Sequence, residues 1–406
     1  MRWANFFHLY QPPRWPAAVI SKVARESYRP LVRFLLSHAH VKVTLNISGS
    51  LTEQLATNPR HKEIITGVRR LLNRGQIELT DSAIYHAILP LLPVREITRQ
   101  IQLNRRLNRR VFGRAYRPSG FFPPEMAYSA KLGKILNKLK YQWVILDGLS
   151  HPGIVNYQQR YRIRGTKMTA VFRNRYISDY LAFAIQAGDS RRFLSTVQRW
   201  NGQQEILVTA MDGENLGHHR RAAKRIWQTL VHQPHIQTIK VSELLKTLPN
   251  DLAITPRAAS WSSQSQELRR GVPFGLWRHP NNELHLLQWQ LFLLVQSLVE
   301  RHERRGRLSS SLRAEFDRAV ASDWYWWASR EPWWDVAIVV GAAQNLHTLA
   351  EELNPPPLLR DRLRALVHKI ATTARRWQET GEARRHAGEF LKSARVPRYL
   401  GGERVH

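Results

Sequence analysis

The chain has 406 residues, of which 43% are hydrophobic and 10% aromatic, so it can form a large folded core and is not disordered by composition. Its 62 lysines and arginines outnumber its 31 acidic residues and give a net charge of +31. The absence of cysteine excludes disulfides, and the absence of a long apolar run excludes a membrane-spanning helix.

The excess of basic residues has two interpretations. One is a polyanionic partner, such as nucleic acid, an acidic polysaccharide or an anionic membrane. The other, which we favour, is a solvated basic surface, because the arginines are spread along many predicted helices rather than gathered in one tract. We therefore expect neither a nucleic acid nor a membrane partner. The N-terminus shows no secretory signal, so a cytoplasmic location is the expectation.

Predicted strands and helices alternate through the first half of the chain. Short apolar runs predict strands at residues 3–8, 41–47, 76–80, 119–122, 142–146, 169–172 and 205–210. Helices are expected between them, including one that ends at Gly75 and others over Val94–Phe112 and Lys131–Leu139. This alternation is typical of an α/β fold with a parallel sheet, and polar residues at the strand ends favour a closed barrel.

The pattern changes after about residue 255. Residues 256–283 are rich in Trp, Ser, Pro and Asn and are expected to form a linker that contributes to the cleft. Leucines at a three-four spacing then predict a helical bundle over residues 284–383, with a break at Pro355-Pro356-Pro357. Residues 384–406 are expected to form a basic tail. The domain prediction is thus a barrel over 1–255 followed by linker, bundle and tail.

Three acidic residues directly follow predicted strands: Glu125, Asp147 and Asp212. The carboxyl ends of parallel strands are where barrels place reactive groups, because the following loop exposes them while the strand holds them in place. Two prolines before Glu125 stiffen its loop. Our interpretation is that Glu125 and Asp212 face each other across a sugar-binding cleft, with Asp147 bracing the site.

Four short motifs occur in an order and spacing that resemble those of glycoside hydrolase family 57, which includes α-amylases, 4-α-glucanotransferases and glycogen branching enzymes. They are His8-Leu9-Tyr10-Gln11-Pro12, Gly75-Gln76-Ile77-Glu78-Leu79, Pro123-Pro124-Glu125-Met126-Ala127 and Met211-Asp212-Gly213-Glu214-Asn215. Each motif alone is a weak signal, whereas four in order are a strong one. The resemblance covers about residues 1–340.

The resemblance implies an incomplete seven-stranded (β/α)7 TIM-like barrel followed by a C-terminal helical bundle. It also implies a retaining hydrolase or transglycosylase acting on α-glucan without a cofactor, with Glu125 as the nucleophile and Asp212 as the acid/base. Elementary chemistry agrees, because cleaving an acetal needs a proton for the departing oxygen and a stabiliser for the positive sugar carbon. Two carboxyl groups about 5–5.5 Å apart supply both with retention of configuration.

Further residues are expected to bind substrate, although each also has a structural interpretation. The histidines can be buried donors, Glu78 can pair with an arginine inside the barrel, and His218 can begin a helix. The tryptophans can stack on sugar rings or pack at a domain junction, and we expect Trp324, Trp326 and Trp334 to be mainly core. The expected substrate-binding residues are His8, Gln11, Glu78, His86, Glu214, His218, Trp261 and Trp277.

Two other functions stay open at this point. One is a non-catalytic barrel that binds a polyanion or a polysaccharide through its positive charge. The other is a metal-dependent polysaccharide deacetylase on a related barrel, although no His-x-x-x-His pair indicates a metal site and we expect none. Departures from the family pattern, such as Leu216-Gly217-His218 in place of an aromatic residue, concern the length of the substrate more than the reaction.

Overall fold

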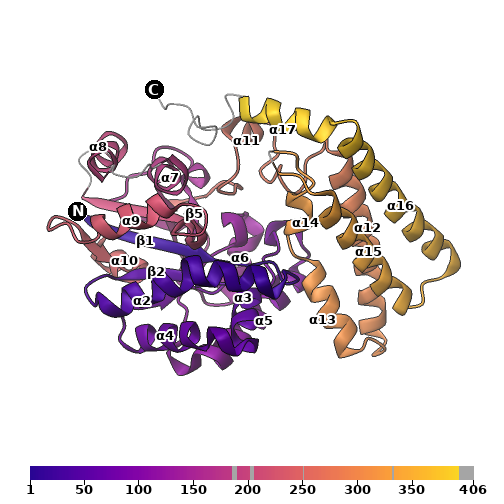
Figure 1. Cartoon of the computed structure of the whole chain (residues 1–406), viewed down its shortest axis with the longest axis horizontal. Coiled ribbons are helices and arrows are strands. Elements are labelled where there is room, and N and C mark those ends of the chain that lie inside the picture. Colours follow the sequence, from indigo (N-terminus) through magenta and orange to yellow (C-terminus); the bar gives the residue numbers. More distant parts are fainter. Residues whose placement is uncertain (185–189, 202–204, 250, 332, 393–406) are drawn as a thin grey trace. The chain divides into compact units, whose positions relative to one another are not determined.

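The computed structural model describes residues 1–184, 190–201, 205–249, 251–331 and 333–392. The chain divides into two compact units, Met1–Trp261 and Ser262–His406 (Figure 1). The division falls inside the stretch that was predicted to be a linker. Residues 382–392 form a helix, so the predicted basic tail is helical at its start, and residues 393–406 lie outside the described part of the chain.

All seven predicted strands are present in the first unit. Strands β3 (Ile77–Leu79), β2 (Val43–Ile47), β1 (Arg2–Leu9) and β8 (Ile206–Asp212) form one parallel set in that order. Strands β4 (Gly120–Phe121), β5 (Trp143–Asp147) and β7 (Thr169–Arg173) form another. The sequence did not predict the three remaining strands, which are β6 (Arg160–Ile163), β9 (Gln237–Ile239) and β10 (Asp251–Ile254).

The two parallel sets curl toward each other into an incomplete barrel, as the family resemblance implied, rather than into the closed barrel that the strand ends favoured. A single parallel bridge between Asp81 and Phe121 joins the end of β3 to β4. On the other side, the Asn174 amide donates to the Val208 carbonyl at 2.7 Å and joins the end of β7 to β8. Each seam has far fewer ladder bonds than the strand pairs within a set, so the barrel depends on side chains to hold its seams.

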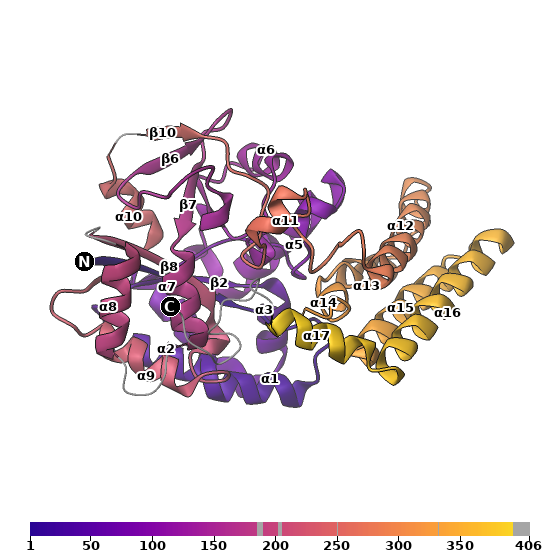
Figure 2. The ribbon, with the colours of Figure 1, turned by 90° about the horizontal axis from the view of Figure 1, so that it is seen from above.

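Helices of the first unit alternate with these strands and pack outside them. Figure 2 shows α1, α2, α8 and α9 along one side of the sheet that contains β1, β2 and β8. Side chains of Ser48, Ser129 and Asn174 cap three of the helices, and Gly75 follows α4 with φ 66°, as a terminating glycine should. The helices are α1 (Ala17–Val23), a π-turn η1 (Ala24–Tyr28), α2 (Arg29–Ser37), α3 (Gly49–Thr57), α4 (Lys62–Asn73), α5 (Val94–Phe112), α6 (Ala130–Lys138), α7 (Arg175–Asp179), α8 (Ser190–Asn201), α9 (Arg221–Leu230) and α10 (Val241–Thr247).

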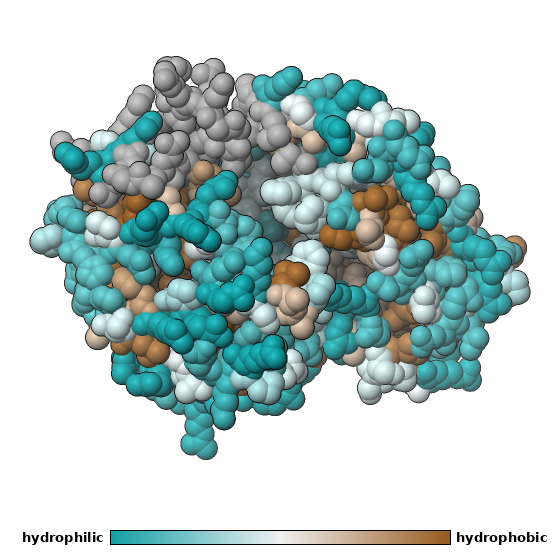
Figure 3. Space-filling view, viewed as in Figure 1, coloured by the Kyte–Doolittle hydropathy of each residue, from teal (hydrophilic) through white to brown (hydrophobic). Residues whose placement is uncertain are grey.

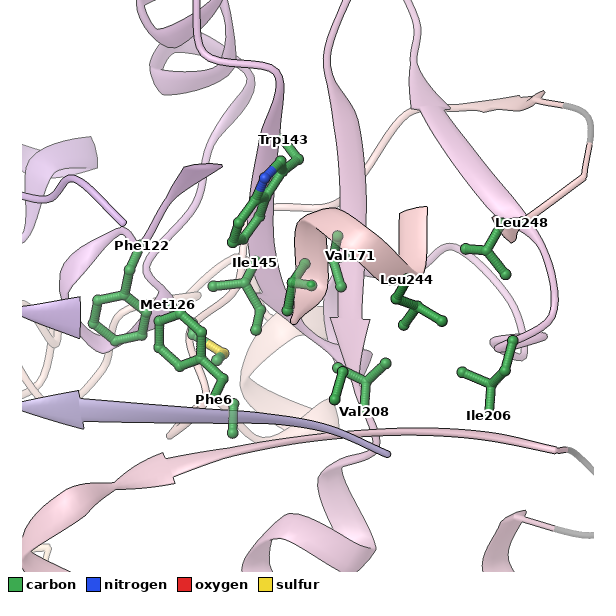
Figure 4. Close-up of a cluster of buried hydrophobic side chains, with 13 residues drawn as sticks. Phe6, Phe122, Met126, Trp143, Ile145, Val171, Ile206, Val208, Leu244 and Leu248 are labelled. Atoms are coloured by element: carbon green, nitrogen blue, oxygen red, sulfur yellow. The ribbon is translucent and has the colours of Figure 1, made fainter. Parts of the chain in front are cut away.

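The barrel interior is an apolar core whose side chains alternate along the strands (Figure 4). Ala4 and Phe6 of β1 and Ile206, Val208 and Ala210 of β8 all face it. Helix α10 closes the amino end of the barrel, where its leucines pack against the strands. Because side chains on a strand repeat every second residue, the next inward positions at the carboxyl end are His8 on β1 and Asp212 on β8.

The second unit is helical, as predicted. Its helices are α11 (Ser265–Arg269), α12 (Glu283–Arg304), α13 (Ser310–Ala319), α14 (Asp323–Trp326), α15 (Val336–Glu352), α16 (Pro357–Glu379) and α17 (Glu382–Lys392). The predicted leucine stripe lies on α12, where Leu284, Leu287 and Leu291 are buried. Trp324 is a core residue as expected, whereas Trp326 and Trp334 are only partly buried, which corrects the prediction for these two.

The surface is largely hydrophilic on the face drawn in Figure 3, where apolar residues form separate patches. Of the described helices, none is both long and apolar enough to cross a membrane.

A buried carboxylate, Asp81, lies at the seam between β3 and β4. It is fully buried and accepts hydrogen bonds from its neighbour in the chain, from helix α5 and from two tyrosines in connecting segments. The donors are Ser82 N at 3.0 Å, Asn104 Nδ2 at 2.6 Å, Arg105 Nε at 2.9 Å, Tyr116 OH at 3.1 Å and Tyr141 OH at 2.6 Å. Asp81 therefore anchors the end of β3, beside the seam, to α5 and to the segment before β5.

We expect Asp81→Ala to lower the free energy of unfolding by about 3 kcal/mol, because it leaves several buried donors without an acceptor. Urea denaturation measures this loss. Asp251→Ala is the matched control, since Asp251 pairs with Arg160 at the surface and its loss should cost no more than about 1 kcal/mol. Equal losses in the two variants would contradict the assignment of Asp81 to the seam.

Candidate active site

A layer of polar side chains covers the carboxyl end of the apolar core. His8 pairs in register with Asp212 on one side and with Asn46 on the other, while Asp147 pairs with Arg173 across β5 and β7. Residues paired in a parallel sheet direct their side chains to the same face, so these groups all point into the mouth of the barrel. Glu125 reaches the same place from the loop after β4.

The loop that presents Glu125 has an unusual backbone. Glu125 and Met126 have φ values of 59° and 51°, in the left-handed region that non-glycine residues rarely adopt. The segment before Trp261 holds this conformation in place: Tyr128 N donates to Ala259 O at 2.9 Å and Trp261 N donates to Glu125 O at 3.0 Å. Strained backbone of this kind persists only where surrounding bonds determine it, and it is concentrated at functional sites.

Trp261 also fixes the Glu125 side chain. Its indole Nε1 donates to Glu125 Oε2 at 2.6 Å, a short bond of the kind made to a charged acceptor. The other carboxylate oxygen, Oε1, lies 3.8 Å from His86 Nε2. The part of the predicted linker that ends at Trp261 therefore belongs to the site.

Two buried histidines lie between Glu125 and the end of β1. His8 Nε2 is 3.0 Å from His86 Nε2, and the two rings stack with centroids 5.0 Å apart. Tyr10 stacks on His86 at 4.0 Å and Phe122 on His8 at 4.5 Å. This packing gives the imidazoles little rotational freedom, so their ring nitrogens occupy fixed positions.

The hydrogen-bond partners assign the protons of this pair. Asn46 Nδ2 donates to Thr80 Oγ1 at 3.1 Å, so Asn46 Oδ1 is the atom that faces His8 Nδ1 at 2.8 Å. His8 therefore has its proton on Nδ1 and accepts at Nε2 from the protonated Nε2 of His86. Burial lowers the pKa of His8 to about 3 and that of His86 well below its usual value, so both rings are neutral near pH 7.

Asp212 and Glu214 form an acidic pair at the end of β8. Asp212 is half-buried at the mouth of the barrel, and Glu214 is buried behind it on the turn η8 (Gly213–Asn215). Burial raises the pKa of both carboxyl groups, and repulsion between two neighbouring negative charges opposes ionisation of the second group of the pair. At neutral pH the pair therefore retains a proton, which is what an acid catalyst needs.

Arg173 brings a positive charge to the same region. Its guanidinium donates to Asp147 at 2.7 Å, is 2.9 Å from Asp179 and donates to the Ala210 carbonyl at 3.0 Å. It also lies over the Trp261 ring at 5.5 Å and opposes the rise in the pKa of Asp212. Asp147 and Asp179 hold the Arg173 guanidinium in place, and Arg173 in turn ties Trp261 to β8.

Several of the predicted site residues come together in this way. His8, His86, Glu125 and Trp261 are in direct contact, and the register of β1 and β8 adds Asp212. Gln11 and Glu214 lie together behind Asp212, where Gln11 Nε2 donates to Tyr28 OH at 3.0 Å and to Glu214 Oε1 at 3.5 Å.

Three other predicted residues have different surroundings. Glu78 accepts from Thr44 Oγ1 at 2.7 Å and from Ser242 N at 3.0 Å, so it joins β3 to α10 at the closed end of the barrel and contacts neither His8 nor an arginine. His218 Nδ1 pairs with Glu26 at 2.5 Å. Trp277 is buried in the second unit, where its carbonyl accepts from Trp289 Nε1, and its part in binding stays a prediction.

Sequence reasoning missed three residues that complete the site. Asn46 was detectable as a polar residue at an inward position of an otherwise apolar strand, opposite His8. Tyr10 lies inside the first motif but was not assigned a role. Tyr28, which donates to Glu214, had no local signal, because its position depends on a π-turn in the first helix.

The described residues include no group of three or more His, Asp or Glu side chains placed to hold a metal ion.

Comparison with known proteins places the chain among carbohydrate enzymes. The profile of glycosyl hydrolase family 57 matches residues 4–255. An α-amylase from Dictyoglomus thermophilum is 24% identical over 257 residues, which are 60% of this chain and 35% of that protein. The chain thus spans about a third of the length of this relative.

Solved structures with the same fold extend further along the chain. A 4-α-glucanotransferase from Thermococcus litoralis has a TM-score of 0.67 at 17% identity, and the match covers 88% of this chain and 60% of the glucanotransferase. A branching enzyme from Thermococcus kodakaraensis has a TM-score of 0.66 at 18% identity, with 90% of this chain and 94% of that chain covered. At these identities the likeness is one of fold.

We expect the imidazole of His8 to stay neutral, with its proton on Nδ1, at every pH at which the protein is folded above about 4. Nitrogen-15 NMR of histidine-labelled protein reads the tautomer directly. In the unfolded chain His8 takes up a second proton near pH 6.5, whereas in the folded chain it does so only near pH 3. The free energy of unfolding should therefore decrease as the pH falls from about 6.5 to about 3. An imidazolium signal from His8 at pH 6 would contradict the assignment.

Proposed function

The chain belongs to glycosyl hydrolase family 57, and we propose that it is a retaining enzyme that hydrolyses or transfers α-1,4-linked glucose chains. The observation that best supports this is the pair of carboxyl groups with unlike surroundings at the mouth of one barrel. Glu125 is held by an indole donor beside neutral histidines, whereas Asp212 belongs to a buried acid pair that retains a proton.

Glu125 is proposed as the nucleophile. One of its oxygens attacks the anomeric carbon and forms an ester, while the bond from that carbon to the glycosidic oxygen breaks. Trp261 Nε1 aligns the carboxylate for attack by fixing its other oxygen, and the backbone bonds from the 259–261 segment hold the loop.

Asp212 is proposed as the acid/base. In the first step its proton passes to the departing glycosidic oxygen, so that the leaving chain departs as a neutral alcohol. In the second step Asp212 accepts a proton from water or from a sugar hydroxyl as that oxygen attacks the ester carbon. Arg173 lies close enough to stabilise the negative charge that Asp212 has between the two steps.

The neutral histidines are proposed to bind the sugar at the reacting ring. An imidazole that stays uncharged can exchange hydrogen bonds with sugar hydroxyls without attracting the nucleophile away from the anomeric carbon. His86 is in contact with the proposed nucleophile, because its Nε2 lies 3.8 Å from Glu125 Oε1. His8 acts through His86 by fixing the tautomer of that ring.

Hydrolysis and transfer share the ester intermediate and differ only in which acceptor reaches it. Incubation with a ladder of maltooligosaccharides separates them. Shorter products alone indicate hydrolysis, and products longer than the starting sugar indicate transfer. If the ladder stays unchanged at high protein concentration, the proposal for α-glucan fails, and binding of a polysaccharide without cleavage becomes the better description.

We expect Glu125→Gln and Asp212→Asn each to lower turnover of maltooligosaccharides by about a thousandfold or more, because each removes a group that the transition state requires. Both substitutions keep the side-chain shape, so circular dichroism and the melting temperature should show a folded protein. Asp251→Asn, at the surface pair with Arg160, serves as the control and should retain full activity. A variant at position 125 or 212 with normal turnover would end the assignment of that residue.

We also expect the pH profile of kcat/KM to fall above about pH 7. Burial raises the pKa of Asp212 to about 7, so its proton is present below that pH and is lost as the pH rises through it. The decline should approach tenfold per pH unit on the alkaline side. Initial rates between about pH 5 and pH 9 measure the profile, and a rate that stays level to pH 9 would contradict Asp212 as the acid.

A further inference from the structure

A π-turn in the first helix brings a tyrosine to the buried acid pair. Residues Ala24–Tyr28 form this turn between α1 and α2. It directs Ser27 Oγ to the Gly213 carbonyl at 2.8 Å and the Tyr28 hydroxyl to Glu214 Oε1. Single π-turns of this kind are rare in helices and occur frequently at functional sites. Here the turn binds two successive residues to η8, which directly follows Asp212.

The two acids of the pair differ sharply in their hydrogen-bond donors. Glu214 Oε1 accepts from the Tyr28 hydroxyl, from Tyr10 N at 3.1 Å and from Gln11 Nε2 at 3.5 Å. For the Asp212 side chain, no hydrogen bond is present among the described residues. Hydrogen-bond donors stabilise the ionised form of a carboxyl group, here Glu214. The proton that the pair retains is then more favourably placed on Asp212.

We propose that Tyr28 is a positioning residue for the acid/base step: its hydroxyl, together with the Tyr10 amide, keeps the negative charge of the pair on Glu214 and so leaves the shared proton on Asp212. The effect on catalysis rests on the proposed function, whereas the position of the proton can be measured in the protein without any substrate. Neither Tyr28 nor Glu214 touches the reacting atoms in this role. Each acts on the reaction through Asp212.

Charged and titratable groups on the neighbouring elements surround the pair. On β1 and its loop they are neutral His8 and Tyr10, and on β7 the cation is Arg173, which lies near Asp212 rather than Glu214. Glu26 of the π-turn pairs with His218. Nearby in the chain are His219 and Arg220 after η8 and Arg221 and Arg225 on α9, which are exposed, and Lys224 on α9, which is partly buried. The position of Arg173 favours charge on Asp212, so the donors on Glu214 must outweigh it.

The chemical consequence concerns the first half-reaction. If the proton is on Asp212, it can pass to the glycosidic oxygen as the bond to the anomeric carbon breaks and Glu125 attacks that carbon. If the proton moves to Glu214, the leaving oxygen receives none, and departure of a sugar alcohol becomes slow. A glycosyl fluoride needs no such proton, because fluoride leaves readily as an anion, and its turnover should be insensitive to the change.

The first test locates the proton without using activity. Carbon-13 NMR of the side-chain carboxyl groups follows the titration of Asp212 and Glu214 in the whole protein, with Asp212→Asn and Glu214→Gln used to assign the signals. In the wild type we expect Glu214 to ionise at lower pH than Asp212. In Tyr28→Phe the difference should shrink or reverse, with the titration of Asp212 moving down by about one pH unit, the size expected for one lost bond to a charged group.

Tyr141→Phe is the matched control. It also removes a buried tyrosine hydroxyl from a buried carboxylate, Asp81, at the seam between β3 and β4. We expect it to lower stability as much as Tyr28→Phe does, while the titrations of Asp212 and Glu214 stay unchanged. The comparison separates an effect on the proton from a general loss of packing.

Kinetics supply the second test. For Tyr28→Phe, the alkaline limb of kcat/KM on maltooligosaccharides should move down by about one pH unit, whereas turnover of α-maltosyl fluoride should stay within about twofold of wild type. An unchanged carboxyl titration in Tyr28→Phe, or equal losses on both substrates without a shift of the limb, would overturn the proposal. Wild-type protein inactive on every glucan would instead defeat the proposed function, and the NMR titration would still decide the role of Tyr28.

Discussion

Because side chains alternate along a strand, the polar groups of the site lie directly beyond the apolar core, at the carboxyl ends of β1 and β8. Every second residue of β1 and β8 faces the barrel interior, and the apolar series on each ends in a polar group, His8 and Asp212 respectively. The register that pairs these two residues is held by ladder bonds along the whole of β1. A shift of β8 by one residue against β1 would turn Asp212 out of the barrel together with the apolar side chains of β8, so the packing of the core also fixes the position of Asp212.

Glu125, the proposed nucleophile, is held in place by other contacts. Glu125 belongs to no ladder, and its left-handed backbone would relax if the loop were alone. The segment from Ala259 to Trp261 prevents this with backbone bonds and adds the indole donor to the carboxylate. Arg173 lies over the same tryptophan and holds the Ala210 carbonyl of β8. The loop of Glu125 and the strand of Asp212 are therefore coupled through Trp261 and Arg173.

The sequence was sufficient for features that depend on local periodicity. The seven barrel strands, helix α5 and the leucine stripe of α12 all follow from spacing alone, and the acidic residues at the strand ends follow from the strands. Features that depend on tertiary contacts were not predictable in this way. Glu78 lies in a recognisable motif, yet Thr44 and the start of α10 hold it at the closed end of the barrel. Strands β6, β9 and β10 have only three or four residues, which is too short for alternation to identify a strand, and the π-turn that places Tyr28 has no pattern of its own.

Burial alone cannot assign different roles to Asp212 and Glu214, because it raises the pKa of both. What distinguishes them is the direction of the surrounding donors, which come from Tyr28, the Tyr10 amide and Gln11 and all reach Glu214. Two of these residues belong to the first motif of the chain and the third to the π-turn that follows it. On the proposal made for Tyr28, the N-terminal segment determines which of the two acids near the end of β8 donates a proton, and a change at Tyr28 alters the proposed acid through Glu214 alone.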